Sequence, residues 1–370
     1  MRDPRLDRLA ALLVGHSLEL KPGQRVYVEL RGAETFEFGK AIIEAVAKAG
    51  GVPLWHFNDD EFINAFACNA TSPAQFESWG ELHRTMMDSV EAYIGVRGNR
   101  NPYEAQAIPA DNEKLFRKAY WERVHSLRIE SKRWVVLRYP SNGLAVMAGM
   151  SCQEFEDLYF NACLMDLGAM SLAMDPLVRR MEAADRVQIT GPGTDLSFSI
   201  KGMKAVKCDG HRNVPDGEVY TAPIIDSMNG QVTYNIPSVY SGHRFEWVRF
   251  VVKDGLITQW DSDRGPAQVG ELLATDEGAR RFGEFSFGLN RMIKKPVLDT
   301  LFDEKIGGSF HLTPGNAYKS ADNGNRSALH WDLVCLQDAA HGGGQILFDG
   351  QVIRQDGFFV PEDLQALDRL

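Results

Sequence analysis

The spacing of apolar residues changes about halfway along the chain, and this change constrains the fold most. Before residue 184, short apolar runs alternate with segments whose apolar residues recur at helical spacing. After it, alternating runs flank Asp-Gly dipeptides, as in VRFVVK-DG-LITQW and QILF-DG-QVI. Strand–helix alternation predicts an open, mainly parallel sheet with helices on its faces. Asp-Gly between alternating runs predicts antiparallel hairpins.

We therefore expect an α/β N-terminal domain over 1–184, followed by a β-rich α+β domain over 185–370. A length of 370 residues is ordinary for two domains. The N-terminal half offers four strand candidates, Gln24–Leu30, Val52–Phe57, Val90–Val96 and Trp134–Tyr139. A helical pattern extends from Gln153 to about Ala184, and a helix over Val269–Arg281 interrupts the second half.

Composition excludes several classes of protein. A formal net charge of -10, spread along the chain, argues against a nucleic-acid-binding protein, which needs a basic face. No apolar run approaches the ~18–20 residues of a membrane span, and the charged N-terminus does not look like a signal peptide. The five cysteines are scattered and never spaced CxxC. This usage is typical of a reducing compartment, so we expect a cytoplasmic protein.

The residues that carry chemistry lie in four segments of the second half. These segments are NVPDGEVYTAP with Glu218, ARRFGEFSFGLN with Glu284, GGSFHLTPGNAY with His311 and Tyr318, and SALHWDLV with His330 and Asp332. We expect Glu284 to follow the end of a helix. In the last segment, Leu329–Val334 is predicted as a strand, so that His330 and Asp332 leave the same face.

An imidazole beside a carboxylate is a natural ligand pair for a divalent metal of the zinc, cobalt or manganese type. Taken alone, a His-x-Asp pair on a strand is more often a surface hydrogen-bonded pair. The whole set of three carboxylates and two imidazoles matches what two adjacent metals require, with one carboxylate bridging them. Spacing alone does not show that the five side chains meet, because the chain has 50 acidic residues and 9 histidines to choose from.

The four segments, in this order, resemble the metal-ligand segments of the M29 family of metallopeptidases, the aminopeptidase T family. The stretches LKPGQRVYVEL, RYPSNGLAVMAGMSCQEFEDLYFNAC and DPLVRRMEAADRVQITGPGTDLSFSI also resemble that family, so the resemblance covers nearly the whole chain. It implies five metal ligands, Glu218, Glu284, His311, His330 and Asp332. It also implies that Tyr318, seven residues after His311, lies near the metals and acts in catalysis.

The resemblance implies a metal-dependent aminopeptidase in which two divalent ions activate water and short peptides lose their N-terminal residues. Either Glu284 or Glu218 is expected to act as general base, and Tyr318 to donate a hydrogen bond to the oxyanion. A homodimer with an enclosed site is also implied. Two segments depart from the family pattern, a shortened KSADNGNRSAL between Tyr318 and His330 and a variant FGLNRMIKKPVLDTLFDEK after Glu284. These departures bear on substrate preference.

Two other functions remain open on this scaffold. Proteins that resemble the family hold one iron and cleave hydroxypyridine rings as dioxygenases, and His311, His330 and Asp332 have the composition of such an iron site. Retention of both Glu218 and Glu284 argues against a site with one metal. A non-catalytic binding protein would be expected to lose ligands. The number of metal ions bound per chain distinguishes the aminopeptidase, with two ions, from the dioxygenase, with one iron.

Overall fold

The structure is a computed structural model that describes residues 2–98, 101 and 103–370. The chain divides into two compact units, one of Met1–Leu164 with Gly210–Val214 and one of Met165–Asp209 with Pro215–Leu370. We call these unit 1 and unit 2. The domain bounds 1–184 and 185–370 stay a prediction.

Unit 1 is built on a five-stranded parallel sheet with the strand order β2-β1-β3-β4-β8. Its strands are β1 (Arg25–Arg31), β2 (Val52–Asn58), β3 (Ala92–Arg97), β4 (Arg133–Arg138) and β8 (Asn213–Val214). The centre of β1 is buried on both faces, as parallel strands covered by helices require. The four strands predicted from the N-terminal half are confirmed to within two residues at either end.

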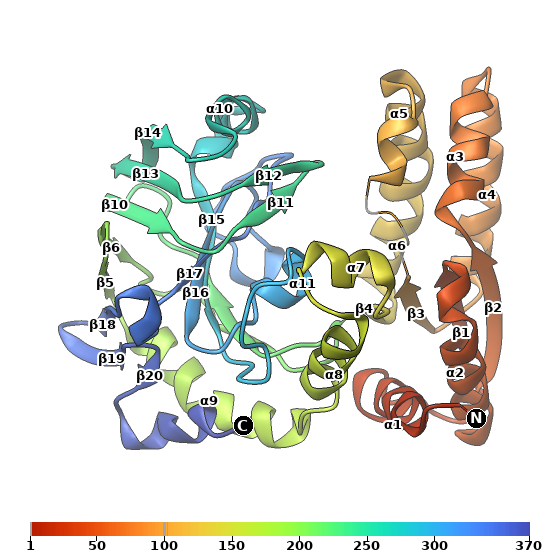
Figure 1. Ribbon diagram of the computed structural model, residues 1–370, viewed down its shortest axis with the longest axis horizontal. Helices are drawn as coiled ribbons and strands as arrows, with labels where there is room; N and C mark the ends of the chain where they lie inside the picture. Colours follow the sequence, from red (N-terminus) through yellow and green to blue (C-terminus); the bar gives the residue numbers. More distant parts are fainter. Residues whose placement is uncertain (1, 99–100, 102) are drawn as a thin grey trace. The chain divides into compact units, whose positions relative to one another are not determined.

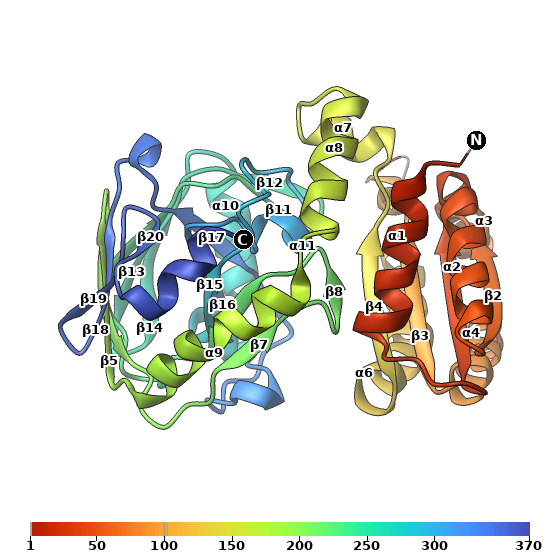
Figure 2. The same ribbon diagram turned by 90° about the horizontal axis from the view of Figure 1, so that it is seen from below.

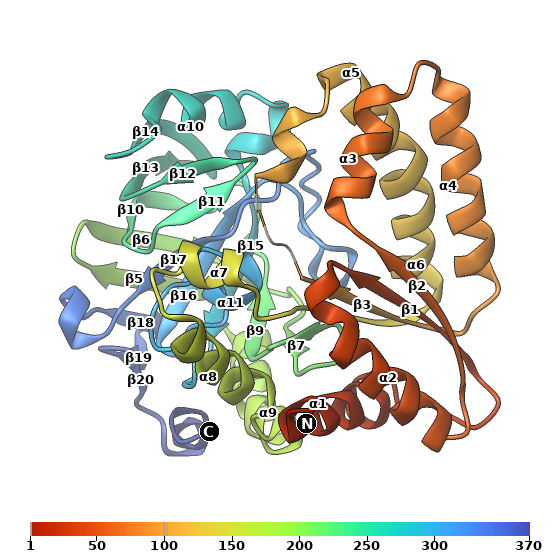
Figure 3. The same cartoon turned by 45° about the vertical axis from the view of Figure 1, so that its right-hand side comes forward.

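The helices of unit 1 are α1 (Pro4–Leu12), α2 (Phe36–Lys48), α3 (Asp60–Asn69), α4 (Pro73–Asp88), α5 (Ala110–Phe116), α6 (Ser126–Ser131), α7 (Asn142–Met147) and α8 (Cys152–Cys163). Helix α2 packs on β1 and β2, and α3 and α4 both neighbour α5 (Figure 3). Helix α2 ends just before Gly50, whose φ of 77° is typical of the glycine that follows a helix. In the described part of the chain, every helix is too short or too polar to cross a bilayer.

Unit 2 is β-rich and antiparallel, as predicted. Its larger sheet has the order β14-β13-β10-β6-β5-β18-β19-β20, and β11 and β12 form a separate two-stranded sheet (Figure 1). These strands are β5 (Arg186–Gly191), β6 (Thr194–Ser199), β10 (Asn229–Tyr234), β11 (Ser238–Tyr240), β12 (His243–Phe245), β13 (Val248–Lys253), β14 (Leu256–Asp261), β18 (Gln345–Phe348), β19 (Gln351–Gln355) and β20 (Phe358–Phe359).

The predicted hairpins are confirmed at both Asp-Gly dipeptides. Asp254 and Gly255 have φ angles of 49° and 72°, and Asp349 and Gly350 have 48° and 83°. Two consecutive positive φ angles define the turn type whose twist matches the flanking strands, and Asp-Gly adopts it at low cost. The fold class predicted from the sequence, an α/β region followed by a β-rich α+β region, is therefore confirmed.

A second sheet of unit 2 has the order β17-β16-β15-β9-β7. Its strands are β7 (Val206–Cys208), β9 (Glu218–Thr221), β15 (Phe282–Gly288), β16 (Ser309–Pro314) and β17 (Leu333–Leu336). Helix α9 (Leu167–Ala183) packs along β7 and β9 (Figure 2). The shorter helices are α10 (Pro266–Leu273) and α11 (Thr300–Asp303). We call this five-stranded sheet the site sheet.

The helical pattern predicted from Gln153 to about Ala184 is confirmed and consists of two helices, because α8 ends at Cys163 and Asp166 caps the start of α9. Two other local predictions are wrong. The helix expected over Val269–Arg281 ends at Leu273 and gives way to a single 3₁₀ turn. Glu284 therefore does not follow a helix but lies within β15, where pairing with β9 and β16 overrides the local helical pattern.

Candidate metal centre

The two faces of β15 have different surroundings: one packs in the core of unit 2, and the other carries Glu284. Phe285 packs against Phe198 of β6, with ring centroids 5.1 Å apart, and Phe287 packs against Phe348 of β18 at 6.0 Å. These aromatic contacts bind one face of the site sheet to the larger sheet of unit 2. Because side chains alternate along a strand, Glu284 leaves β15 on the opposite face.

The strand register brings Glu218 and His311 to the same face as Glu284. Glu218 on β9 pairs with Gly288, and His311 on β16 pairs with Ser286, so both belong to the set that alternates with the aromatic residues. The Nε2 atom of His311 lies 3.1 Å from Glu284 Oε1 and 3.5 Å from Glu218 Oε2. The three side chains are buried, and they form a first triad of donors.

His330 and Asp332 complete a second triad with Glu284. His330 Nε2 lies 3.5 Å from Glu284 Oε2 and 3.4 Å from Asp332 Oδ1. The predicted strand over Leu329–Val334 is partly wrong, because β17 begins only at Leu333. His330 instead forms an isolated bridge with Gly315. The two side chains nevertheless converge, as their i, i+2 spacing in extended chain predicts.

Neighbouring groups orient the second triad. His330 Nδ1 donates to the carbonyl of Asn316 at 2.9 Å, which leaves Nε2 facing the carboxylates. The hydroxyl of Thr313 donates to Asp332 Oδ1 at 2.6 Å. Support of this kind from outside the donor set is typical of metal ligands, since it fixes the ring tautomer and the direction of the carboxylate.

The structure thus brings together all five side chains that the sequence singled out. They form two triads that share one residue: Glu218, Glu284 and His311 make the first, and Glu284, His330 and Asp332 make the second. Within each triad the donor atoms lie within 4.8 Å of one another. We call this set the carboxylate–histidine centre. Their role as ligands stays a prediction.

The charges of the centre favour a bound cation. Although burial opposes it, the hydrogen bond to Glu284 and the charge of Glu218 raise the pKa of His311 to about 9. Asp332 raises the pKa of His330 to about 10, again against burial. These raised pKa values show that the surrounding carboxylates favour positive charge at both imidazoles, and a divalent ion would supply such charge in place of a proton.

A buried oxygen of Glu284 that has no hydrogen-bond partner in the described part of the chain also favours a bound cation. Burial raises the pKa of Glu284, and its Oε2 atom is buried without a hydrogen-bond partner among the described residues. A buried carboxylate oxygen without a donor is costly. A metal ion bound by the second triad would satisfy this oxygen, which lies beside His330, so the residues present fit a divalent metal.

Tyr318 lies at the edge of the centre, where the sequence placed it. Its ring is 4.6 Å from that of His330 and 5.7 Å from that of Tyr220, measured between centroids. The residue is 46% exposed, while burial of the phenol group and the charge of Glu284 raise its pKa well above the usual range, so the hydroxyl keeps its proton. This position is compatible with a hydrogen-bond donor to substrate.

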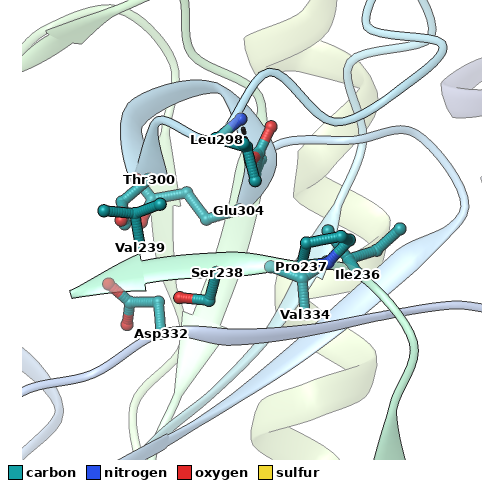
Figure 4. A pocket seen from close by; sticks show the side chains of 10 residues that line it. Ile236, Pro237, Ser238, Val239, Leu298, Thr300, Glu304, Asp332 and Val334 are labelled. Atoms are coloured by element: carbon teal, nitrogen blue, oxygen red, sulfur yellow. Dashed lines mark hydrogen bonds between the residues drawn. The ribbon is translucent and has the colours of Figure 1, made fainter. Parts of the chain in front are cut away.

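Sequence reasoning missed a buried lysine beside the centre. Lys305 lies just after α11, and its Nζ atom is 2.5 Å from Glu218 Oε1. Glu304 and Asp332 line a small pocket of about 10 Å³, and Figure 4 shows the strand of Ser238 and Val239 passing between them in this view. The charged run FDEK was visible in the sequence, but no spacing in it indicates that the lysine is buried.

Comparison with known proteins agrees with this geometry. The model of the M29 family, described as thermophilic metalloprotease, matches residues 2–352. Aminopeptidase 2 of Geobacillus stearothermophilus is 34% identical, with 95% of this chain and 94% of the relative covered. Aminopeptidase T of Thermus aquaticus is 25% identical, with 96% of each chain covered.

Solved structures share the fold. Wild-type AmpT from Thermus thermophilus has a TM-score of 0.81 at 22% identity and covers 97% of this chain and 99% of its own. A 2,5-dihydroxypyridine dioxygenase from Pseudomonas putida KT2440 has a TM-score of 0.61 at 14% identity, with 97% and 98% covered. The predicted resemblance is confirmed: the chain belongs to the M29 family of metallopeptidases, and the metallo-aminopeptidase expected from its sequence is the enzyme class of its relatives.

Proposed function

We propose that the chain is a metal-dependent aminopeptidase that releases N-terminal residues from short peptides with the help of two divalent ions. The observation that carries this proposal is the position of Glu284, a buried carboxylate shared between two triads of donors. A bridging carboxylate between two adjacent ions is the usual arrangement of dinuclear hydrolases. Curated relatives named as aminopeptidases support the reaction class.

In this proposal Glu218 and His311 would hold one ion, His330 and Asp332 would hold the other, and Glu284, which belongs to both triads, would contribute to each. Ions of the zinc, cobalt or manganese type supply a water of lowered pKa and a Lewis acid for the scissile carbonyl. The donor set of carboxylates and imidazoles is compatible with each of these metals.

The chain's own residues supply the remaining chemistry. A carboxylate of the centre, Glu284 or Glu218, accepts the proton of the attacking water. The hydroxyl of Tyr318 donates to the oxyanion, a contribution of ~3 kcal/mol in comparable sites. We further propose a cytoplasmic homodimer, as the resemblance and the cysteine usage imply. The segment between Tyr318 and His330 adjoins this site and is expected to influence substrate preference.

Elemental analysis of the purified chain, paired with hydrolysis of aminoacyl-p-nitroanilides after addition of zinc, cobalt or manganese, tests the proposal. We expect metal-dependent release of p-nitroaniline from substrates with a free N-terminus. An N-acetylated substrate is the matched control, because it lacks the amine that defines an aminopeptidase. No hydrolysis with any metal would contradict the proposal.

A dioxygenase with one iron is the second candidate. The ion pair between Lys305 and Glu218 favours it, because it gives Glu218 a partner other than a metal. The grouping of donors is less favourable, since His311 belongs with Glu218 in one triad while His330 and Asp332 belong to the other. One iron per chain and no hydrolysis of peptides would favour this candidate.

A further inference from the structure

Lys305 holds an unusual position for a lysine, fully buried against three carboxylates. Its Nζ atom lies 2.5 Å from Glu218 Oε1, 2.7 Å from Glu304 Oε1 and 3.5 Å from Asp216 Oδ1. Lys305 and Asp216 are both 0% exposed. A buried ammonium must be paired to be tolerated, so these carboxylates fix the lysine in place.

The two oxygens of Glu218 therefore face different partners. Oε1 pairs with Lys305. Oε2 accepts from the hydroxyl of Ser286 at 3.2 Å and lies 3.5 Å from His311 Nε2. One oxygen is thus committed to a cation that the chain itself provides, and the other remains for the first triad.

The second triad has no such cation. Among the described residues, Glu284 and Asp332 pair only with the imidazoles of His311 and His330 and with the hydroxyl of Thr313. No lysine or arginine of the described chain neutralises either carboxylate. These two carboxylates therefore face the second triad without a cation that the described chain itself provides.

We infer that Lys305 makes the two triads unequal, so that Glu284, His330 and Asp332 bind one divalent ion tightly and the triad of Glu218 binds the second weakly. The ammonium of Lys305, paired with Glu218, partly neutralises this carboxylate. It also repels a metal ion bound to the same carboxylate. Coulomb repulsion over a few ångströms in a buried site is strong enough for a difference of at least about tenfold in affinity. This inference rests on the proposed function, because it concerns the two ions proposed there.

Titration of the metal-free, full-length protein with Co²⁺ tests the inference directly. Absorbance of the bound cobalt and competition with a chelator give the number of ions and their affinities without any substrate. We expect one tight ion, followed by a second at least about tenfold weaker. Two ions of equal affinity would overturn the inference.

Site variants identify which triad binds the tight ion. Asp332→Asn is expected to lose the tight ion, whereas His311→Gln is expected to keep it and lose the weak one. The reverse pattern would contradict the assignment. These two variants leave the ion pairs of Lys305 with Asp216, Glu218 and Glu304 in place. The test therefore does not depend on the folding of a lysine variant.

Replacement of the lysine tests its role. Lys305→Met keeps an unbranched side chain, one atom shorter, and removes the charge, and we expect the second ion to bind at least about tenfold more tightly. Lys207→Met is the matched control, because the ammonium of Lys207 lies in the same unit and pairs with Asp175 at 2.7 Å and with Ser171, both of which are outside the centre. An unchanged second affinity in a folded Lys305→Met protein would overturn the role of the lysine.

The outcome is separable from that of the proposed function. Two unequal ions without hydrolysis of peptides would contradict the aminopeptidase and leave this inference standing. Hydrolysis of peptides together with two ions of equal affinity would support the aminopeptidase and overturn this inference.

Discussion

Each unit buries a carboxylate among titratable groups, and the two surroundings differ in the source of positive charge. In unit 1, Glu29 on β1 is 1% exposed and accepts hydrogen bonds from Tyr93, from Tyr120 at 2.9 Å and from Arg97 at 3.2 Å. Although burial opposes it, Arg97 and Arg31 lower the pKa of Glu29 well below its usual range. Arginine side chains of the chain itself balance this carboxylate.

In unit 2, Glu284 meets other acids and two imidazoles instead of arginines. Burial raises its pKa, and the charges of Asp332 and Glu218 add to that effect. Carboxylates outnumber the permanent cations here, with Lys305 as the one lysine that contacts the described residues of the centre. Buried charge of this kind needs a partner. The comparison teaches that an excess of buried carboxylates beside imidazoles indicates an exchangeable cation, whereas a balanced cluster serves the fold.

Removal of the shared carboxylate is expected to have the largest effect. Glu284→Gln removes charge from both triads, so metal content should fall to background and turnover should decrease by more than about 100-fold, the upper range for loss of a supporting group outside the ligand set. Elemental analysis and p-nitroanilide hydrolysis measure the two effects. Glu29→Gln is the control, and metal bound per folded chain should stay unchanged in it. Normal activity in Glu284→Gln would remove this residue from the site.

The same control variant is expected to weaken the fold. Glu29→Gln leaves the guanidinium of Arg97 buried without its carboxylate, and breaking a buried pair costs about 3–5 kcal/mol of unfolding free energy. Urea denaturation measures this loss. Glu91→Gln is a matched comparison in the same unit, because its pair with Arg25 is exposed and should contribute less than about 1 kcal/mol. Equal losses in the two variants would contradict the contrast.

The sequence predicted the framework of both units better than the details of the centre. Apolar runs located the strands of unit 1, and Asp-Gly dipeptides located two hairpins of unit 2, because both signals are local. Glu284 was expected after a helix, since the residues before it have a helical pattern that only pairing with distant strands overrides. His330 and Asp332 were expected on a strand and lie just before one.

The five proposed ligands were named through resemblance to a family, because spacing along the chain does not report which distant side chains meet. Lys305 and Thr313 were missed for the same physical reason. Whether a lysine is buried, or a hydroxyl points at a carboxylate, depends on strand register and on the packing of α11. Neither leaves a periodic pattern in the sequence.

Acid is expected to destabilise unit 1 through a buried histidine. Burial, together with the neighbouring His56, lowers the pKa of His83 to about 4. The unfolded chain takes up this proton near pH 6.5, so the stabilisation is complete above that pH and is lost as the pH falls towards 4. Linkage gives a loss of about 2 kcal/mol between pH 7 and pH 5 from this group.

The difference between wild type and His83→Gln isolates that contribution. Hydrogen–deuterium exchange of the peptides covering β1 and α4 reports the stability of unit 1 at each pH. Exchange in wild type should increase on acidification by more than in the variant, which has no imidazole to charge at this position. Equal acid sensitivity in the two proteins would mean that His83 is not held neutral by the fold.

The smallest expected effect concerns a hydroxyl that supports the centre. Thr313→Val keeps the shape of the side chain but removes the donor to Asp332 Oδ1, so this carboxylate is less well oriented for a metal. Loss of such a supporting hydrogen bond lowers metal affinity by about tenfold, the lower end of the range for groups of this kind. Thr221→Val is the matched control, because Thr221 lies on β9 and donates to the carbonyl of Lys204. If Asp332 holds the tightly bound ion, Co²⁺ titration should show the loss in the first equivalent for Thr313→Val and no change for Thr221→Val. A loss confined to the second equivalent would place Asp332 at the weaker position and so reverse the order of the triads.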